Sequence, residues 1–319
     1  MKFFERIKKF FFSKHIKTLP SEGLEIDKIV LLAVDEREPE KVMDVLRNRG
    51  AEMRSESIVH IISHLPLDRR LEAIELCADY IDPYDLSDLA LKKLDYNGKI
   101  AILEKFQDSF DLEDLYKLFG NIPPDQRATA LSRCIDRLDS LGISDVIKNY
   151  VPLYDRLDCL NKYCDKLDGF SKARVIEGLD SARKVVALKT YAGEINKTDL
   201  YDIVCGTETG SICDVLDVAY QNMTSKQIMD VIQYYVPDEK KLETMYKCCN
   251  NMDSATISDL IKFVIPDNQK EEALIAMQNR INVNNVGDIL QFCVKTVSAL
   301  KKVQHNLDPE DVEFFKNKL

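Results

Sequence analysis

The sequence contains no tryptophan, and glycine accounts for only 11 of its 319 residues. Glycine-rich phosphate loops of the GxxxxGK[ST] and GxGxxG types are missing, as is the GxSxG turn of serine hydrolases. These absences argue against nucleotide-dependent and serine-hydrolase chemistry. They favour a protein that is not an enzyme and that carries no cofactor.

Long apolar runs are also missing, and no stretch approaches the 18 or more apolar residues of a typical membrane-spanning helix. Basic residues are outnumbered, because 44 Lys and Arg stand against 54 Asp and Glu and give a net charge of −10. Nucleic-acid affinity is built chiefly from clustered cations, so this balance disfavours a polyanionic ligand.

The nine cysteines form no CxxC pair and no Cys/His metal-ligand spacing. Most of them stand at apolar positions of the pattern described below, which is typical of reduced thiols used as small core side chains. We therefore expect a cytoplasmic protein without disulfides and without a cysteine metal site.

The dominant feature is a repeat of 28 or 29 residues. Nine copies begin at or near Glu38, Pro66, Asp95, Pro123, Pro152, Asp180, Glu208, Pro237 and Pro266. Below, the first residue of each copy is position zero.

Three sets of positions are apolar in every copy or nearly so. Position eight is Leu46, Ile74, Leu103, Leu131, Leu160, Leu188, Leu216, Met245 or Leu274, and position fifteen is Met53, Ile81, Phe110, Leu138, Leu167, Ile195, Met223, Met252 or Ile281. Positions 23 and 24 carry pairs such as Leu89–Ala90 and Val231–Ile232. Spacings of three, four and seven indicate two short helices with one apolar face each.

Position sixteen marks the start of the second helix. It holds Asp82, Asp111, Asp139, Asp168, Asn196, Thr224, Asp253 and Asn282, all of which are N-cap residue types. Thr224 and Gln227 also have capping-box spacing. Lys172 interrupts the apolar stripe of its own second helix.

Two helices that are each apolar on one face cannot bury themselves alone and must stack on neighbouring copies. The sequence therefore predicts an all-α superhelix, or solenoid, of about nine helical hairpins with capping helices. We expect a basic amphipathic helix and linker at 1–20, a capping half-repeat at 21–37, a continuous solenoid at 38–293, and capping helices at 294–319. The helix-pair organisation resembles the HEAT-like class of α-solenoids, and the resemblance is architectural only.

Position 22 forms an acidic column on the second helices. Its members are Asp88, Asp145, Asp202, Asp230, Asp259 and Asp288. Because position 22 points about 150° from the buried stripe, we expect these carboxylates to be exposed and stacked at intervals of about 10 Å. One interpretation is a surface for a basic or amphipathic partner segment, strengthened by Tyr234, Phe263 and Phe292. The other is a solvated face paired within each helix, for example Asp88 with Lys92.

His60 and His64 are four residues apart on an exposed helix face and could share a metal ion, although HIISH lacks the Glu of the HExxH motif. A metal-dependent enzyme at this pair is one alternative function. Another is a nucleic-acid-associated helical repeat with a positive stripe made of Lys92, Lys93, Lys148 and Lys262. The leading hypothesis is a non-catalytic scaffold or adaptor that binds a segment of another protein along the solenoid groove.

Residues 1–17 differ from the rest, since six Lys and Arg stand against one Glu. In a helix the apolar face would hold Phe3, Phe4, Ile7, Phe10 and Phe11, and the opposite face would hold Lys2, Arg6 and Lys9. Such a helix could bind an anionic membrane surface, cap the first repeat or dock on the acidic solenoid, or serve as a targeting peptide.

Overall fold

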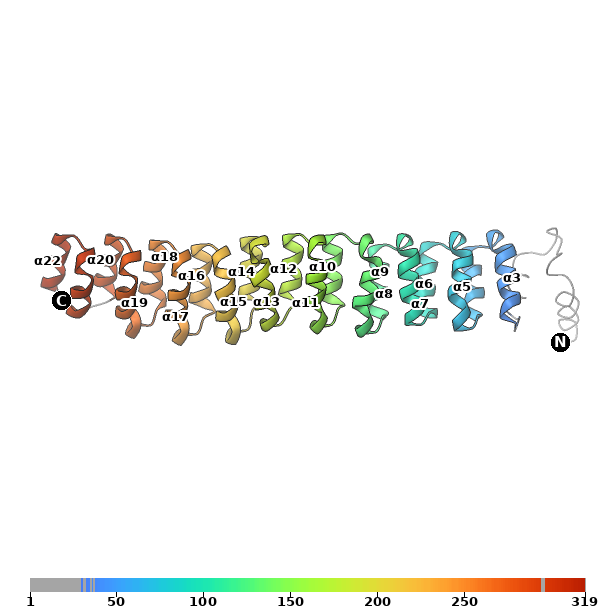
Figure 1. Ribbon diagram of the computed structural model, residues 1–319, viewed down its shortest axis with the longest axis horizontal. Helices are drawn as coiled ribbons and strands as arrows, with labels where there is room; N and C mark the ends of the chain where they lie inside the picture. Colours follow the sequence, from blue (N-terminus) through green and yellow to red (C-terminus); the bar gives the residue numbers. More distant parts are fainter. Residues whose placement is uncertain (1–29, 31–32, 35, 37, 294–295, 319) are drawn as a thin grey trace, which may run out of the picture. The chain divides into compact units, whose positions relative to one another are not determined.

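The computed structural model describes residues 30, 33–34, 36, 38–293 and 296–318. Over these residues the chain forms short helices joined by turns, with no β-strand (Figure 1). The predicted all-α repeat fold is confirmed. Helix follows helix in chain order because each copy supplies two capped, one-sided helices.

The chain divides into two compact units, Met1–Pro152 and Leu153–Leu319, at the start of the fifth copy. The first unit contains α3 (Pro39–Arg49), α4 (Ser55–His64), α5 (Leu67–Cys77), α6 (Pro83–Lys93), α7 (Tyr96–Phe106), α8 (Leu112–Asn121), α9 (Arg127–Cys134) and α10 (Ser140–Asn149). The second contains α11 (Leu153–Lys162), α12 (Gly169–Glu177), α13 (Ser181–Tyr191), α14 (Lys197–Cys205), α15 (Ile212–Ala219), α16 (Ser225–Tyr234), α17 (Asp238–Cys248), α18 (Ser254–Asp259), α19 (Lys270–Met277), α20 (Val283–Phe292), α21 (Val297–Val303) and α22 (Pro309–Lys318).

Within each unit, helices of the same kind stack on one another. First helices pack as α3 on α5, α7 on α9, and α13 on α15, and second helices pack as α4 on α6, α6 on α8, α12 on α14, and α14 on α16. Each first helix of a regular copy ends in a short 3-10 turn, such as Ala78–Tyr80 or Cys249–Asn251, before the second helix begins. Each unit is therefore a solenoid-like array in which a copy is buried by its neighbours.

The core lies where the apolar columns predict. All nine side chains at position eight are at most 2% exposed, and all nine at position fifteen are at most 8% exposed. Lys172, which interrupts the stripe, is nevertheless buried, because its ammonium pairs with Glu194 and lies 5.4 Å from the centre of the Tyr191 ring. A buried cation is tolerated there because a carboxylate and an aromatic face replace water.

The predicted N-caps are largely confirmed. The side chains of Asp111, Asp139, Asp168, Asn196, Thr224, Asp253 and Asn282 accept backbone N–H groups of the following helical turn, and Thr224 with Gln227 forms the capping box. Asp82 was wrongly predicted, since its side chain makes no cap bond. Its backbone N–H instead donates to Ser55 Oγ at 2.9 Å, and Ser55 Oγ also binds the carboxylate of Asp85.

The last copies depart slightly from the pattern. The helix that begins as α18 continues as a π-helix, Leu260–Val264, whose wider turn is closed by Ile265 N–H donating to Leu260 O at 2.9 Å. The predicted C-terminal capping helices correspond to α21 and α22, and Phe315 of α22 is buried. Most of the predicted half-repeat at 21–37 lies outside the described residues.

Basic side chains at position four form hydrogen bonds with the ends of the second helices. Arg127, at the start of α9, donates to the carbonyls of Ile122 at 2.8 Å and Gly120 at 3.1 Å, which end α8, and to Tyr150 O at 3.0 Å, which follows α10. One guanidinium thus satisfies the C-terminal carbonyls of two successive second helices, where the helix dipole also favours a cation. We call this arrangement the carbonyl clamp.

Arg70 repeats the carbonyl clamp, and position four of three further copies also donates to a carbonyl at a helix end. Arg70 donates to Ser63 O, Leu65 O and Lys93 O. Arg156 donates to Gly178 O at 2.7 Å, Lys184 to Gly206 O at 3.4 Å, and Lys270 to Lys262 O at 2.9 Å. Partial burial disfavours the charged form of Lys184, because desolvation lowers the pKa of its ammonium. Sequence reasoning missed the column, although Arg or Lys stands at position four in seven of the nine copies.

On the first helices, charges pair from one copy to the next. Arg133 and Glu104 lie 3.0 Å apart, Arg137 and Asp108 2.9 Å, and Lys247 and Asp217 3.1 Å, in each case 29 or 30 residues apart in sequence. These side chains are partly or largely exposed, so each pair contributes only about 0–1 kcal/mol. As a result, many charged side chains on the surface formed by the first helices are already paired with a side chain of opposite charge.

Replacing Arg127 by Met should show how much the carbonyl clamp contributes to the stability of the fold. Methionine keeps an apolar stem but leaves three carbonyls without their charged donor, so we expect a loss of about 2–3 kcal/mol in the free energy of unfolding. Urea unfolding combined with hydrogen exchange over α8–α10 measures it. Arg133→Met is the matched control, because it removes a half-exposed ion pair and should cost less than about 1 kcal/mol. Equal losses would contradict the clamp.

Asp253→Ala should show a pH-dependent cost. The Thr256 backbone N–H, which donates to the Asp253 carboxylate at 2.8 Å, lowers the pKa of this carboxyl below its ordinary value. A lowered pKa means that the carboxylate stabilises the fold above the ordinary pKa and that this contribution is lost as the pH falls through the lowered one. We expect a cost of about 1 kcal/mol at neutral pH that shrinks in acid.

Unfolding curves of Asp253→Ala at a series of pH values measure this cost, and Asp253→Asn serves as the control because Asn is also an N-cap. The Asn variant should retain most of the stability at neutral pH. A cost of Asp253→Ala that is the same at every pH would show that the carboxylate charge contributes nothing.

Candidate functional site

The six carboxylates at position 22 lie at the surface of the second helices, as their position opposite the buried pair requires. Asp202 and Asp288 are exposed, and Asp88, Asp145, Asp230 and Asp259 are half exposed. Position 23 beside them is buried in every case. The structure therefore places the whole column where a partner could reach it.

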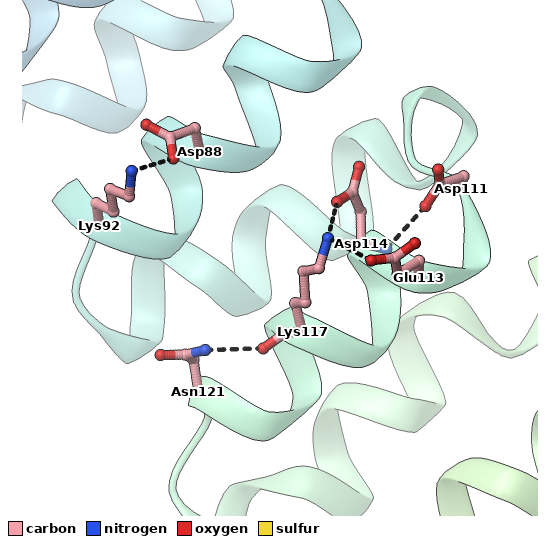
Figure 2. A network of polar contacts seen from close by, with 7 residues as sticks. All are labelled: Asp88, Lys92, Asp111, Glu113, Asp114, Lys117 and Asn121. Atoms are coloured by element: carbon pink, nitrogen blue, oxygen red, sulfur yellow. Dashed lines mark hydrogen bonds and ion pairs between the residues drawn. The ribbon is translucent and has the colours of Figure 1, made fainter.

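In the first unit, charged side chains on this surface form ion pairs within their own helix. Asp88 pairs with Lys92 at 2.6 Å on α6, and the corresponding position of α8 is Lys117, which lies 2.9 Å from Glu113 and 3.5 Å from Asp114 (Figure 2). The interpretation of a solvated, internally paired face holds for Asp88. Lys117 interrupts the acidic column before α10.

In the second unit the column is uninterrupted over four successive second helices. Asp202, Asp230, Asp259 and Asp288 lie on α14, α16, α18 and α20, which pack in that order. Asp259 pairs with Lys262 at 3.2 Å. Within the described part of the chain, Asp202, Asp230 and Asp288 make no ion pair. Three carboxylates here are thus available to an external cation.

Two large aromatic side chains project beside these carboxylates. Tyr234, at the end of α16, is 70% exposed, and Phe263, in the π-helix after α18, is 76% exposed. The Lys262 ammonium lies 5.5 Å from the centre of the Phe263 ring. The side chain of Phe292, the third predicted aromatic, lies outside the described part of the structure. We call Asp202, Asp230, Asp259, Asp288, Tyr234 and Phe263 the acidic–aromatic strip.

A polar cluster that sequence reasoning missed lies near the strip. The Cys205 thiol, at the end of α14, lies close to the hydroxyl groups of Tyr201 and Tyr235. Burial raises the pKa of the Cys205 thiol, and the two hydroxyl groups oppose that effect. The raised pKa keeps the thiol in its neutral form. Cys205 and Tyr235 stand at different positions of the repeat, 25 and 27, so the periodic columns did not indicate this cluster.

The histidine pair is placed as predicted on one helix, with ring centres 4.7 Å apart. His64 Nδ1 is 2.8 Å from the backbone carbonyl of His60, so this ring nitrogen is used within the helix. Among the described residues, no three His, Cys, Asp or Glu side chains converge as a metal-binding group. The geometry gives the pair no further ligand.

All the predicted membrane-contact residues between Lys2 and Phe11 lie outside the described residues. Of the helices that the structure describes, none has the length and apolar character needed to cross a bilayer. All nine cysteines fall within the described range, and all are free.

Comparison of the chain with protein-family models, with curated proteins and with solved structures finds no match. The candidate site therefore rests on the geometry of the acidic–aromatic strip.

Proposed function

We propose that this chain is a non-catalytic scaffold whose acidic–aromatic strip binds a basic, amphipathic segment of another protein. The observation that carries the proposal is the coincidence of three unpaired carboxylates with two largely exposed aromatic rings on consecutive helices of one unit. In its helix-pair organisation the scaffold is of the HEAT-like kind, in which stacked second helices present one long binding surface.

The chemistry of the strip defines the partner. Exposed aromatic rings are enriched at binding surfaces because they bury a large apolar area when a partner covers them. Carboxylates spaced by about 10 Å on packed helices match cations one or two turns apart on an amphipathic helix, or along an extended chain. We expect the aromatic rings to supply most of the affinity and the carboxylates to supply orientation and association rate.

A direct test titrates a fluorescent peptide, with Lys and Leu arranged on opposite helix faces, onto the full-length protein. Fluorescence anisotropy at low and at raised ionic strength measures Kd. We expect Tyr234→Ala with Phe263→Ala to weaken binding by roughly tenfold or more. We expect neutralisation of Asp202, Asp230 and Asp288 to Asn to weaken binding and to remove most of its salt dependence.

The first unit offers matched controls for this experiment. Tyr84 on α6 is 78% exposed, like Tyr234, and Asp88 occupies the same column but is paired with Lys92. Tyr84→Ala and Asp88→Asn should change Kd by less than about twofold. Equal effects in both units, or failure of the peptide to bind at all, would rule out the strip as the binding site. A peptide with Glu in place of Lys should not bind.

A further inference from the structure

The C-terminal end of α16 lacks the cation that binds the ends of its neighbours. The other second helices from α4 to α18 each accept a hydrogen bond there from a basic side chain at position four, namely Arg70, Arg127, Arg156, Lys184 or Lys270. Among these helices, all of which the structure describes, only α16 receives no such side chain. Its last carbonyls therefore have no charged donor within the described chain.

Two features of the sequence account for this difference. Position four of the seventh copy, which corresponds to Arg127 in the fourth, is Ile212, whose side chain is fully buried and has no donor. Position four of the next copy is Lys241, whose ammonium pairs with Asp238 at 2.7 Å. Neither first helix beside α16 thus supplies a cation to its end.

The surroundings of this helix end favour a cation from outside the chain. The dipole of α16 places partial negative charge at its C-terminal carbonyls. Asp230 lies one turn before Tyr234 on the same helix, and Asp202 lies on α14, which packs on α16. Both carboxylates are at least half exposed, and neither makes an ion pair in the described part of the chain. An incoming cationic side chain would therefore meet carbonyls and carboxylates that no internal cation binds.

The other copies of the repeat identify the side chain that such an end binds. Tyr235 stands at position 27, and so does Tyr150, whose carbonyl accepts a hydrogen bond from the Arg127 guanidinium at 3.0 Å. The same guanidinium binds two further carbonyls at the end of α8. A planar guanidinium carries five N–H donors and can bind several carbonyls at once, which the compact ammonium of lysine does less well. The comparison therefore favours arginine.

We infer that the end of α16 binds an arginine side chain of the basic segment that docks on the acidic–aromatic strip. The inference rests on the proposed function, because it names the side chain that fixes the position of that segment. The partner's guanidinium takes the place at α16 that Arg127 takes at α10. Tyr234, which is 70% exposed at the same helix end, then packs against the apolar side chains beside that arginine.

The test uses the amphipathic Lys and Leu peptide with each Lys replaced in turn by Arg. At the position that binds best, Arg is also replaced by citrulline, which has the shape of arginine without its charge. Fluorescence anisotropy with the full-length protein measures Kd. We expect the Arg peptide to bind about tenfold more tightly than the citrulline peptide, because charged hydrogen bonds to the carbonyls are lost. The Lys peptide should lie between them.

A cation supplied by the chain itself should remove this preference. Ile212→Arg and Ile212→Lys place at position four the residue types that Arg127 and Lys270 represent in other copies. In either variant we expect the Kd values of the Arg and citrulline peptides to differ by less than about twofold, because the site is already filled. Val42→Arg, the same kind of change in the first copy, is the matched control and should leave the preference intact.

Hydrogen exchange shows where the arginine binds. The backbone N–H groups of Tyr235 and Val236 both donate to Val231 O and close α16. Their exchange should be about fivefold or more slower with the Arg peptide than with the citrulline peptide, both at saturation, because bound carbonyls hold the last turn closed. This measurement uses the unmodified protein, so it decides even where an Ile212 variant does not fold.

Two outcomes would overturn the inference and leave the proposed function standing. One is equal Kd values for the Arg and citrulline peptides at every position. The other is an arginine preference that persists in a folded Ile212 variant and disappears in Tyr234→Ala, which would show stacking of the guanidinium on the ring instead. Failure of every peptide to bind would refute the proposed function, on which this site depends.

Discussion

The carbonyl clamp is the interaction on which this structure depends. An α-helix ends with carbonyls that have no partner inside the helix, and a stack of second helices brings many such ends together. Arg70 and Arg127 solve the problem by binding the ends of two successive helices at once. Position four is accordingly Arg or Lys in seven of the nine copies, although the net charge of the chain is negative.

The carbonyl clamp and the ion pairs between first helices leave the two surfaces of each unit with different charge. Pairs such as Lys105 with Glu75 and Lys247 with Asp217 already match the charge between first helices. Second helices are joined through their ends, so their exposed faces need no such pairing. Unpaired carboxylates can consequently accumulate there at little cost to the fold, and in the second unit they do.

The sequence was sufficient for what is local or strictly periodic. Columns such as position eight and caps such as Asp253 follow from spacing and side-chain chemistry, and the structure places them as expected. The failed cap at Asp82 depends on Ser55, which comes from another copy, and the approach of Tyr235 to Cys205 likewise depends on two helix ends that meet in space. The π-helix at Leu260–Val264 has no signature in the residue pattern. Contacts between copies are the part that periodicity alone leaves undetermined.

Rigidity connects the clamp to the proposed binding surface. Lys270 donates to the carbonyl of Lys262, the residue immediately before Phe263, so the backbone that carries this ring is held at its end. The Tyr235 backbone N–H donates to Val231 O at 3.0 Å and similarly fixes the end of α16 next to Tyr234. Exposed rings on a fixed backbone lose little conformational entropy when a partner covers them. The interactions that close the helix ends thereby also preorganise the surface that we expect to bind.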